Sequence, residues 1–86
     1  MERKDYGILY DYYGNLLTDK QKDFYDLYYN EDLSLAEIAE LKGISRQAAW
    51  DNIRHAADKL VEIEEKTGLI KKVQDLEWRL KTSQTN

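Results

Sequence analysis

The chain has 86 residues and a formal net charge of −4, and 35% of its side chains are charged. It is long enough for one domain with a modest core. It contains no cysteine, which excludes disulfide bonds and thiolate metal sites. It shows no secretory leader pattern and no apolar run of the ~20 residues that cross a membrane. We therefore expect a cytoplasmic protein without a membrane partner.

The first helix is expected over residues 3–13. Apolar side chains recur there at three- and four-residue spacing, namely Tyr6, Leu9, Tyr10 and Tyr13. The chain has seven tyrosines, which could either fill the core or stack on nucleic-acid bases. Their spacing favours core or dimer packing, with Tyr12 and Tyr29 as the most exposed.

The second helix is expected to begin after a break at residues 14–15. Thr18 is suited to cap it, because Gln21 three residues later completes a capping box. The helix should end around residues 29–30. Its inward side chains are expected to be Phe24, Leu27 and Tyr28.

Residues 34–60 predict a helix-turn-helix motif, the arrangement that places a helix in the DNA major groove. Ser34 caps the first helix, with Glu37 as its capping-box partner, and Ser45 caps the second. Gly43 lies where the first helix must end, because glycine permits a left-handed backbone. The expected contacts between the two helices come from Ile38, Ala39, Ile44, Ala49 and Ile53.

The second helix of the motif continues to Thr67-Gly68, and a fifth helix is expected from Leu69 to about Lys81. We therefore divide the chain into a helix-turn-helix domain (1–68) and a C-terminal helix with a short disordered tail (69–86). The fifth helix has a coiled-coil-like seam of Leu69, Val73, Leu76 and Leu80. This seam either folds back on its own domain or, as we favour, forms a homodimer with help from Trp78, which we expect to flank it.

The outward face of the second motif helix is the candidate DNA-binding site. Ala49, Ile53, Ala56 and Leu60 should point to the core, with Trp50 and Asn52 on the flanks. The candidate contacts are Lys42, Ser45, Arg46, Gln47, Asp51 and Arg54. Arginines can grip phosphate or read guanine, and a glutamine can pair with adenine. The alternative is that Arg46, Asp51 and Arg54 only form ion pairs along the helix.

The charge distribution favours weak DNA binding by one subunit. Residues 1–33 carry eight acidic and four basic side chains, and the motif itself is neutral. Enzymatic chemistry has little support, because His55 is the single histidine and no catalytic, phosphate-binding or metal-binding motif is present. We expect no catalytic residue, no metal and no cofactor.

Several segments resemble the YlxM family of small bacterial helix-turn-helix proteins. They are Leu17-Thr18-Asp19-Lys20-Gln21-Lys22, Tyr28-Tyr29, residues 34–40, Ser45-Arg46-Gln47-Ala48 and Asp51-Asn52-Ile53. The resemblance covers about residues 5–66. Ala49 and Trp50 stand where the family tends to carry valine and tyrosine, and the chain after Lys66 is shorter than is usual.

The resemblance implies an all-α, five-helix fold similar to region four of sigma factors, dimeric and located in the bacterial cytoplasm. Family genes typically neighbour those of the signal recognition particle GTPase and its receptor, which implies a part in protein targeting. Two functions therefore stay open: a regulator that binds double-stranded DNA, and an accessory factor that binds the targeting GTPase or its receptor.

An acidic surface is the candidate for binding such a protein partner. Asp26, Glu31 and Asp32 lie at the expected C-terminal end of the second helix, where the helix dipole disfavours acids. The sequence shows no local role for these three acids. Either they serve solubility alone or they bind a basic partner.

Overall fold

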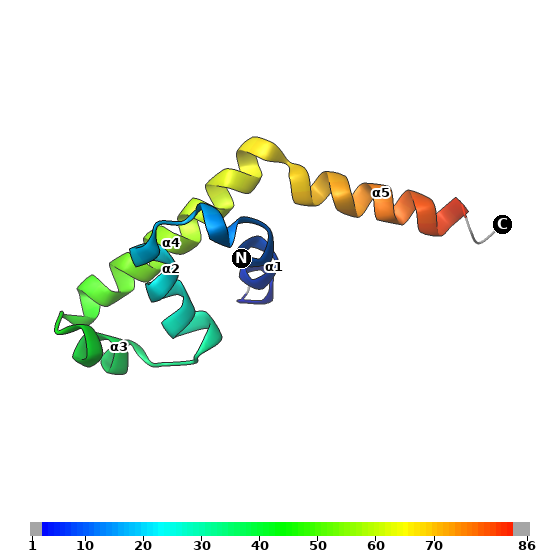
Figure 1. The fold of residues 1–86 in the computed structure, drawn as a ribbon. Coiled ribbons are helices and arrows are strands. Elements are labelled where there is room, and N and C mark those ends of the chain that lie inside the picture. The colour runs from blue at the N-terminus through cyan, green and yellow to red at the C-terminus, as the bar shows by residue number, and fades with distance from the viewer. Residues whose placement is uncertain (1–2, 84–86) are drawn as a thin grey trace.

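The computed structural model describes residues 3–83, which form helices joined by short turns and contain no strand (Figure 1). In chain order the elements are α1 (Arg3–Tyr13), the 3-10 turn η1 (Gly14–Leu16), α2 (Asp19–Tyr25), the π-helix η2 (Asp26–Asn30), α3 (Leu35–Lys42), α4 (Arg46–Thr67) and α5 (Leu69–Ser83). The expected all-α fold with five α-helices is confirmed.

Three helices begin at the caps that the sequence predicts. The hydroxyl oxygen of Thr18 accepts a hydrogen bond from the Gln21 amide at 3.1 Å, and the Gln21 side chain accepts one from the Thr18 amide at 3.0 Å. Ser34 begins α3 with the same reciprocal pair of bonds. Ser45 begins α4, its hydroxyl oxygen accepting from the Ala48 amide at 3.0 Å. These bonds satisfy amides that a helix start leaves without a partner.

The turn between α3 and α4 depends on a glycine. Gly43 has a φ of 67°, in the left-handed region that a side chain disfavours. Its amide donates to the carbonyls of Ala39 and Glu40, which ends α3. Because α4 begins only three residues later, the turn is tight and sets the angle between the two helices.

α4 runs through the domain and packs against α1, α2 and α3. Its inward side is completely buried and consists of Ala49, Ile53, Ala56 and Leu60. The first half of α4 packs on Phe24 of α2 and Ile38 of α3, and the second half packs on Leu9 and Tyr13 of α1. Burial on one side of α4 leaves its other side free to meet solvent or a ligand.

Tyrosines fill the space between α1 and the end of the second helix. Tyr25 is 1% exposed, and its ring stacks on Tyr10 and Tyr29 with centroids 4.5 and 4.7 Å apart. The sequence pattern did not predict that Tyr25 is a core residue. The prediction that Tyr29 is exposed is wrong, because Tyr29 packs against both core clusters. The reason is that α1 covers this side of the helix. Tyr12 is 44% exposed, as expected.

α5 points away from the rest of the domain (Figure 1), and the described chain is elongated, with extents of 58 × 23 × 19 Å. Its start is anchored, because Ile70 is 6% exposed and joins the core around α1 and α4. The helix continues through Thr82 and Ser83, where the Thr82 hydroxyl donates to the Trp78 carbonyl. The disordered tail expected from residue 82 is therefore wrong for these two residues, and residues 84–86 lie outside the described chain.

A carboxylate fixes the joint between α4 and α5. One oxygen of Glu64 accepts from the Tyr13 hydroxyl at 2.6 Å and from the Ile70 amide at 3.1 Å, and the other accepts from the Lys71 amide at 3.3 Å. The hydrogen bond from Tyr13 is the main cause that lowers the pKa of Glu64. Because Glu64 caps the first amides of α5 while it is held by α1, it sets the direction in which α5 leaves.

Candidate nucleic-acid interface

The N-terminal half of α4 presents polar side chains on a rigid support. Ala49 and Ile53 are completely buried, which fixes the rotation of the helix about its axis. Arg46, Gln47 and Arg54 are exposed on the opposite side. The phase that the sequence predicts for these residues is confirmed, because the buried residues are the expected ones.

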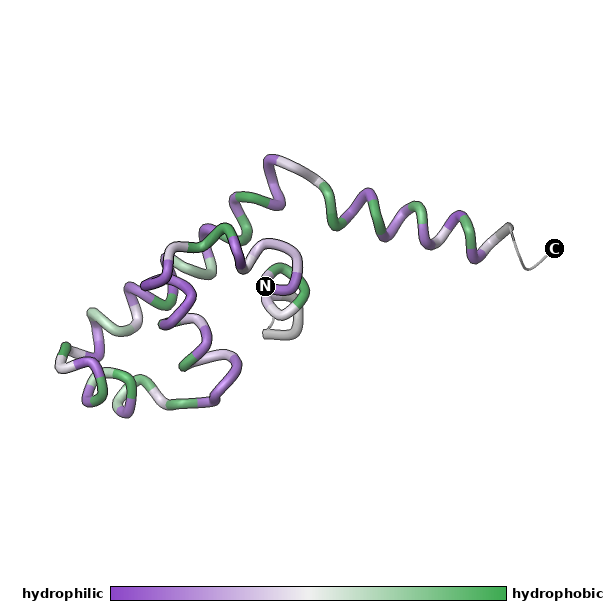
Figure 2. The backbone as a smooth tube through the Cα atoms, viewed as in Figure 1, coloured by the Kyte–Doolittle hydropathy of each residue, from purple (hydrophilic) through white to green (hydrophobic). Residues whose placement is uncertain are grey.

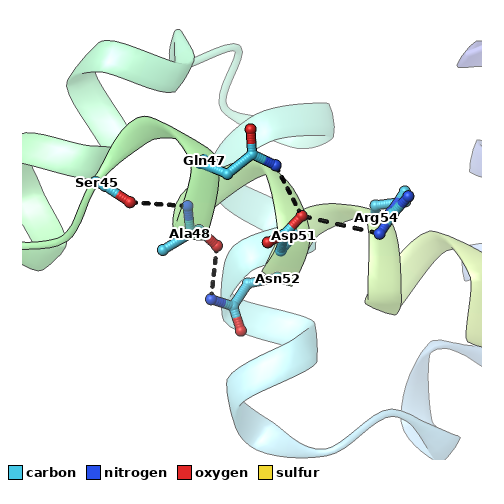
Figure 3. A network of polar contacts seen from close by, with 6 residues as sticks. All are labelled: Ser45, Gln47, Ala48, Asp51, Asn52 and Arg54. Carbon is cyan, nitrogen blue, oxygen red and sulfur yellow. Dashed lines mark hydrogen bonds and ion pairs between the residues drawn. The ribbon is translucent and has the colours of Figure 1, made fainter.

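Three of the candidate residues form one polar network along α4 (Figure 3). The Gln47 side-chain amide donates to an Asp51 carboxylate oxygen at 3.0 Å, and the Arg54 guanidinium lies 3.8 Å from the same oxygen. The ion pair that the alternative expects is therefore present between Asp51 and Arg54, and whether these residues also contact DNA stays a prediction. The pair is long and more than half of the Arg54 side chain is exposed, so such a contact contributes little and can be exchanged for a phosphate. Arg46 forms no ion pair within the part of the chain that the structure describes.

The start of α4 is suited to an anion. The amides of the first helical turn have no acceptor inside the helix. The Ala48 amide donates a hydrogen bond to the Ser45 hydroxyl oxygen. The amides of Arg46 and Gln47 remain at the helix start, where the helix dipole favours negative charge. The Ser45 hydroxyl still has its hydrogen to donate, since only its oxygen is used as an acceptor.

Lys42 lies in a different setting from the one expected. It is the last residue of α3, and its ammonium group pairs with the Asp23 carboxylate of α2. It also lies 5.6 Å from the centre of the Phe24 ring. The pair borders an open groove beside the start of α4, which is also lined by Asp19 and Asn52. The sequence missed Asp23, because a contact between residues 19 apart leaves no local pattern.

The two residues expected on the flanks of α4 are structural. Trp50 is half-buried and packs edge-on against Tyr28, with ring centroids 6.1 Å apart. The Asn52 side chain donates to the Ala48 carbonyl at 2.9 Å, within the same helix (Figure 3). Trp50 therefore helps hold α4 against the end of the second helix, whereas the Asn52 side chain forms its hydrogen bond within α4 and borders the groove.

Two of the acidic candidate residues have local roles that the sequence did not reveal. Asp26 is half-buried and accepts a hydrogen bond from the Asn30 side chain at 2.6 Å. Burial, together with a hydrogen bond to Asp26, raises the pKa of Tyr10 to about 12. Asp32 has a φ of 58°, a left-handed conformation that aspartate tolerates better than most residues. Of the three acids, Glu31 is left as an exposed side chain without an evident part in the fold.

The expected seam on α5 is exposed rather than folded back on the domain. Leu69, Leu76 and Leu80 are 46, 53 and 65% exposed, and Val73 is half-buried. Figure 2 shows hydrophobic residues recurring along the whole of α5. Trp78 is 68% exposed and does not flank the seam as expected. It follows Leu76 by two residues, which places it roughly 200° around the helix.

The fold and the α3–turn–α4 geometry together define a helix-turn-helix protein. Residues 1–85 match the family described as "Putative helix-turn-helix protein, YlxM / p13 like", and the chain belongs to this family. The resemblance seen in the sequence is therefore confirmed. Within residues 3–83 no helix is long and apolar enough to cross a membrane.

Curated relatives from several bacteria support this assignment. A UPF0122 protein of Caldanaerobacter subterraneus is 51% identical over 69 residues, which cover 80% of this chain and 59% of the relative. UPF0122 proteins of Desulforamulus reducens and Clostridium perfringens are each 52% identical, over 66 and 79 residues. These matches cover 77 and 92% of this chain and 56 and 70% of the relatives. The chain thus spans about three fifths of the length of several curated relatives that it matches.

Proposed function

We propose that this chain is a regulatory protein that binds double-stranded DNA with the N-terminal half of α4. The observation that supports this most strongly is the exposed set of Arg46, Gln47 and Arg54 on a helix whose other side is completely buried. A recognition helix needs this combination, because base contacts require side chains whose position is fixed by the fold.

Each residue has a distinct task in this proposal. Arg46 and Arg54 bind phosphate or the edge of a guanine, and Gln47 binds an adenine. The hydroxyl of Ser45 and the free amides at the start of α4 bind a phosphate. Asp51 holds Gln47 and Arg54 in the free protein and releases them when DNA replaces it.

We further propose that the protein binds DNA as a homodimer through the seam of α5. Few basic side chains surround α4 in one subunit, and binding to DNA depends largely on phosphate neutralisation. A dimer doubles the number of phosphate contacts. It also reads two half-sites, as dimeric helix-turn-helix proteins do.

The test is a binding titration of labelled genomic DNA fragments at low and moderate salt. The wild-type chain should bind at low salt, and Arg46→Ala and Arg54→Ala should each weaken binding by about 1–3 kcal/mol, roughly 5- to 150-fold, if each arginine reads a base. Each lost phosphate contact should reduce the slope of log K against log salt by about 0.9.

Lys66→Ala is the matched control, because it also removes one positive charge from α4. Lys66 lies at the far end of the helix with 72% of its side chain exposed. Its replacement should leave binding nearly unchanged. An equal loss from Lys66→Ala would show that only net charge matters, and no binding at low salt would exclude the DNA-binding function.

The acidic surface supports a second candidate, an accessory factor for the signal recognition particle GTPase or its receptor. Residues 1–68 carry fifteen acidic and nine basic side chains, a net charge of −6 that suits a basic partner. The sharper test now replaces Glu31 by Lys and keeps Asp26 and Asp32, because Asp26 has a local hydrogen bond and Asp32 has a left-handed backbone. The Glu31→Lys variant should lose association with the purified GTPase at low salt. Unchanged association would assign Glu31 to solubility.

A further inference from the structure

Exposed apolar side chains gather on two parts of the described chain. Within it, eight large hydrophobic residues are at least 41% exposed, and seven of them lie on α1–η1 or on α5. The first group, here called the α1–η1 surface, is Ile8, Tyr12 and Leu16. The second is Leu69, Leu76, Trp78 and Leu80. Grouping of this kind marks an interaction surface more often than single exposed residues do.

The α1–η1 surface is separate from the side of α1 that faces the core. Ile8, Tyr12 and Leu16 follow one another at intervals of four residues, whereas the buried residues of α1 are Leu9 and Tyr13. α1 therefore has a second apolar side that the described chain leaves in water.

α5 also exposes one large hydrophobic side chain outside its seam, within the residues that the structure describes. Trp78 lies roughly opposite the seam, about 200° around the helix from Leu76, with polar neighbours such as Lys71 and Lys81 on the same side. If two seams met in a simple zipper, Trp78 would stay 68% exposed. Burial of that indole requires a second surface.

The far half of α5 does not reach the α1–η1 surface of its own chain. The helix points away from α1 (Figure 1), and Glu64 holds its start in that direction by bonds to Tyr13 and the Ile70 amide. A second copy that approaches in the opposite direction can place its α5 there.

The size of the seam and the charges both favour this second copy. A stable interface buries about 800 Å² on each partner, from roughly 20–30 residues a side, and the seam offers only four residues. Residues 69–86 carry four basic and two acidic side chains, a net charge of +2, against −6 for residues 1–68. A protruding α5 is thus attracted to the body of another copy.

We propose that the α1–η1 surface receives α5 of a second copy, with the Trp78 side of that helix against it, while the seams of the two α5 helices meet. Each α5 then lies between the α5 and the α1 of the other chain. This inference rests on the dimer that forms part of the proposed function, and it is independent of DNA binding.

The first test compares two leucines of equal exposure. Leu16 and Leu41 are both 63% exposed, but only Leu16 belongs to the α1–η1 surface. Leu16→Glu should raise the dissociation constant of the dimer roughly 10- to 100-fold in sedimentation equilibrium, as expected for the loss of a buried leucine. Leu41→Glu should leave it nearly unchanged, with helicity retained in both variants. Equal dimer dissociation constants for the Leu16→Glu and Leu41→Glu variants would overturn the proposal.

The second test identifies the partner of the surface directly. A photo-reactive benzoylphenylalanine replaces Tyr12, and labelled and unlabelled chains are mixed before illumination. Cross-links should join position 12 of one chain to residues 73–82 of the other, and the same probe at Leu41 should give none. A dimer whose cross-links avoid α5 would overturn this inference and leave the dimer intact. A monomer in sedimentation would overturn both, and neither result depends on DNA.

Discussion

At the scale of single residues, the contact between Asp23 and Lys42 bears most directly on the proposed DNA binding. Lys42 is the basic side chain nearest to the helix-turn-helix turn, and the Asp23 carboxylate holds it toward α2. Both side chains are partly exposed, so the ion pair is weak and a DNA phosphate can compete for the lysine. In the proposed DNA complex, Asp23 therefore competes with phosphate for Lys42 and limits the affinity.

Asp23→Asn should therefore strengthen DNA binding. An exposed ion pair contributes about 0.2–1 kcal/mol, so the dissociation constant should fall roughly 1.4- to 5-fold. The released Lys42 should make one more phosphate contact, so the slope of log K against log salt should steepen by about 0.9. Asp11→Asn is the control, because it removes one exposed negative charge from α1. If both variants bind alike, the gain comes from net charge and the Lys42 pair has no part in it.

The lowered pKa of Glu64 predicts a loss of folding stability in acid. Hydrogen bonds from Tyr13 and from the first amides of α5 lower its pKa below the usual 4.5. A lowered pKa in the folded state gives stability that is present above about pH 4.5 and is lost as pH falls through the folded value. The unfolding free energy of the wild type should therefore decline below about pH 4.5.

Glu64→Gln should make this decline shallower, since the amide does not titrate; Glu37 and Glu62, whose pKa values are also lowered, keep their share of it. Denaturant unfolding followed by circular dichroism between neutral and acid pH measures the effect. Glu65→Gln, which changes an exposed neighbour on α4, should keep the acid decline of the wild type. A Glu64→Gln profile as steep as the wild-type one would show that the loss arises elsewhere.

At the scale of the helices, local chemistry was enough to predict most of the fold. The caps at Thr18, Ser34 and Ser45 and the turn at Gly43 each depend on residues within a few positions of one another. Such interactions leave a pattern in the sequence. The exposed side of α4 could be predicted for the same reason, because the spacing of its buried residues fixes the opposite face.

Contacts between distant parts of the chain could not be predicted in this way. Tyr25 and Tyr29 are covered by α1, and Lys42 is held by Asp23, in both cases through packing that no local spacing shows. The hydrogen bond between Asp26 and Tyr10 could not be predicted for the same reason, since Tyr10 lies on another helix. The part of the candidate site that depends on α4 alone was predicted, and the part that depends on α2 was missed.

The seam of α5 gives a prediction at this scale. Replacement of Val73 and Leu76 by Glu puts two charges into the apolar stripe without touching the core around Ile70. The wild type should sediment as a dimer at low micromolar concentration and the double variant as a monomer, with unchanged helicity. A monomeric wild type would show that the stripe does not form an interface at this concentration.

At the scale of the whole molecule, the chain combines a compact four-helix body with a protruding arm. The body positions α4, and the arm carries exposed apolar residues and a net positive charge. In the proposed dimer the two arms hold two copies of α4 at a fixed separation. We therefore expect the preferred DNA to contain two half-sites related by two-fold symmetry.

The most direct test of the DNA-binding proposal is to map the amide chemical shifts of the protein during a titration with the best-bound DNA fragment. The proposal predicts that the largest changes lie at residues 45–54, at the start and on the exposed side of α4. Changes confined to the acidic surface around Glu31, or no changes at saturating DNA, would contradict it.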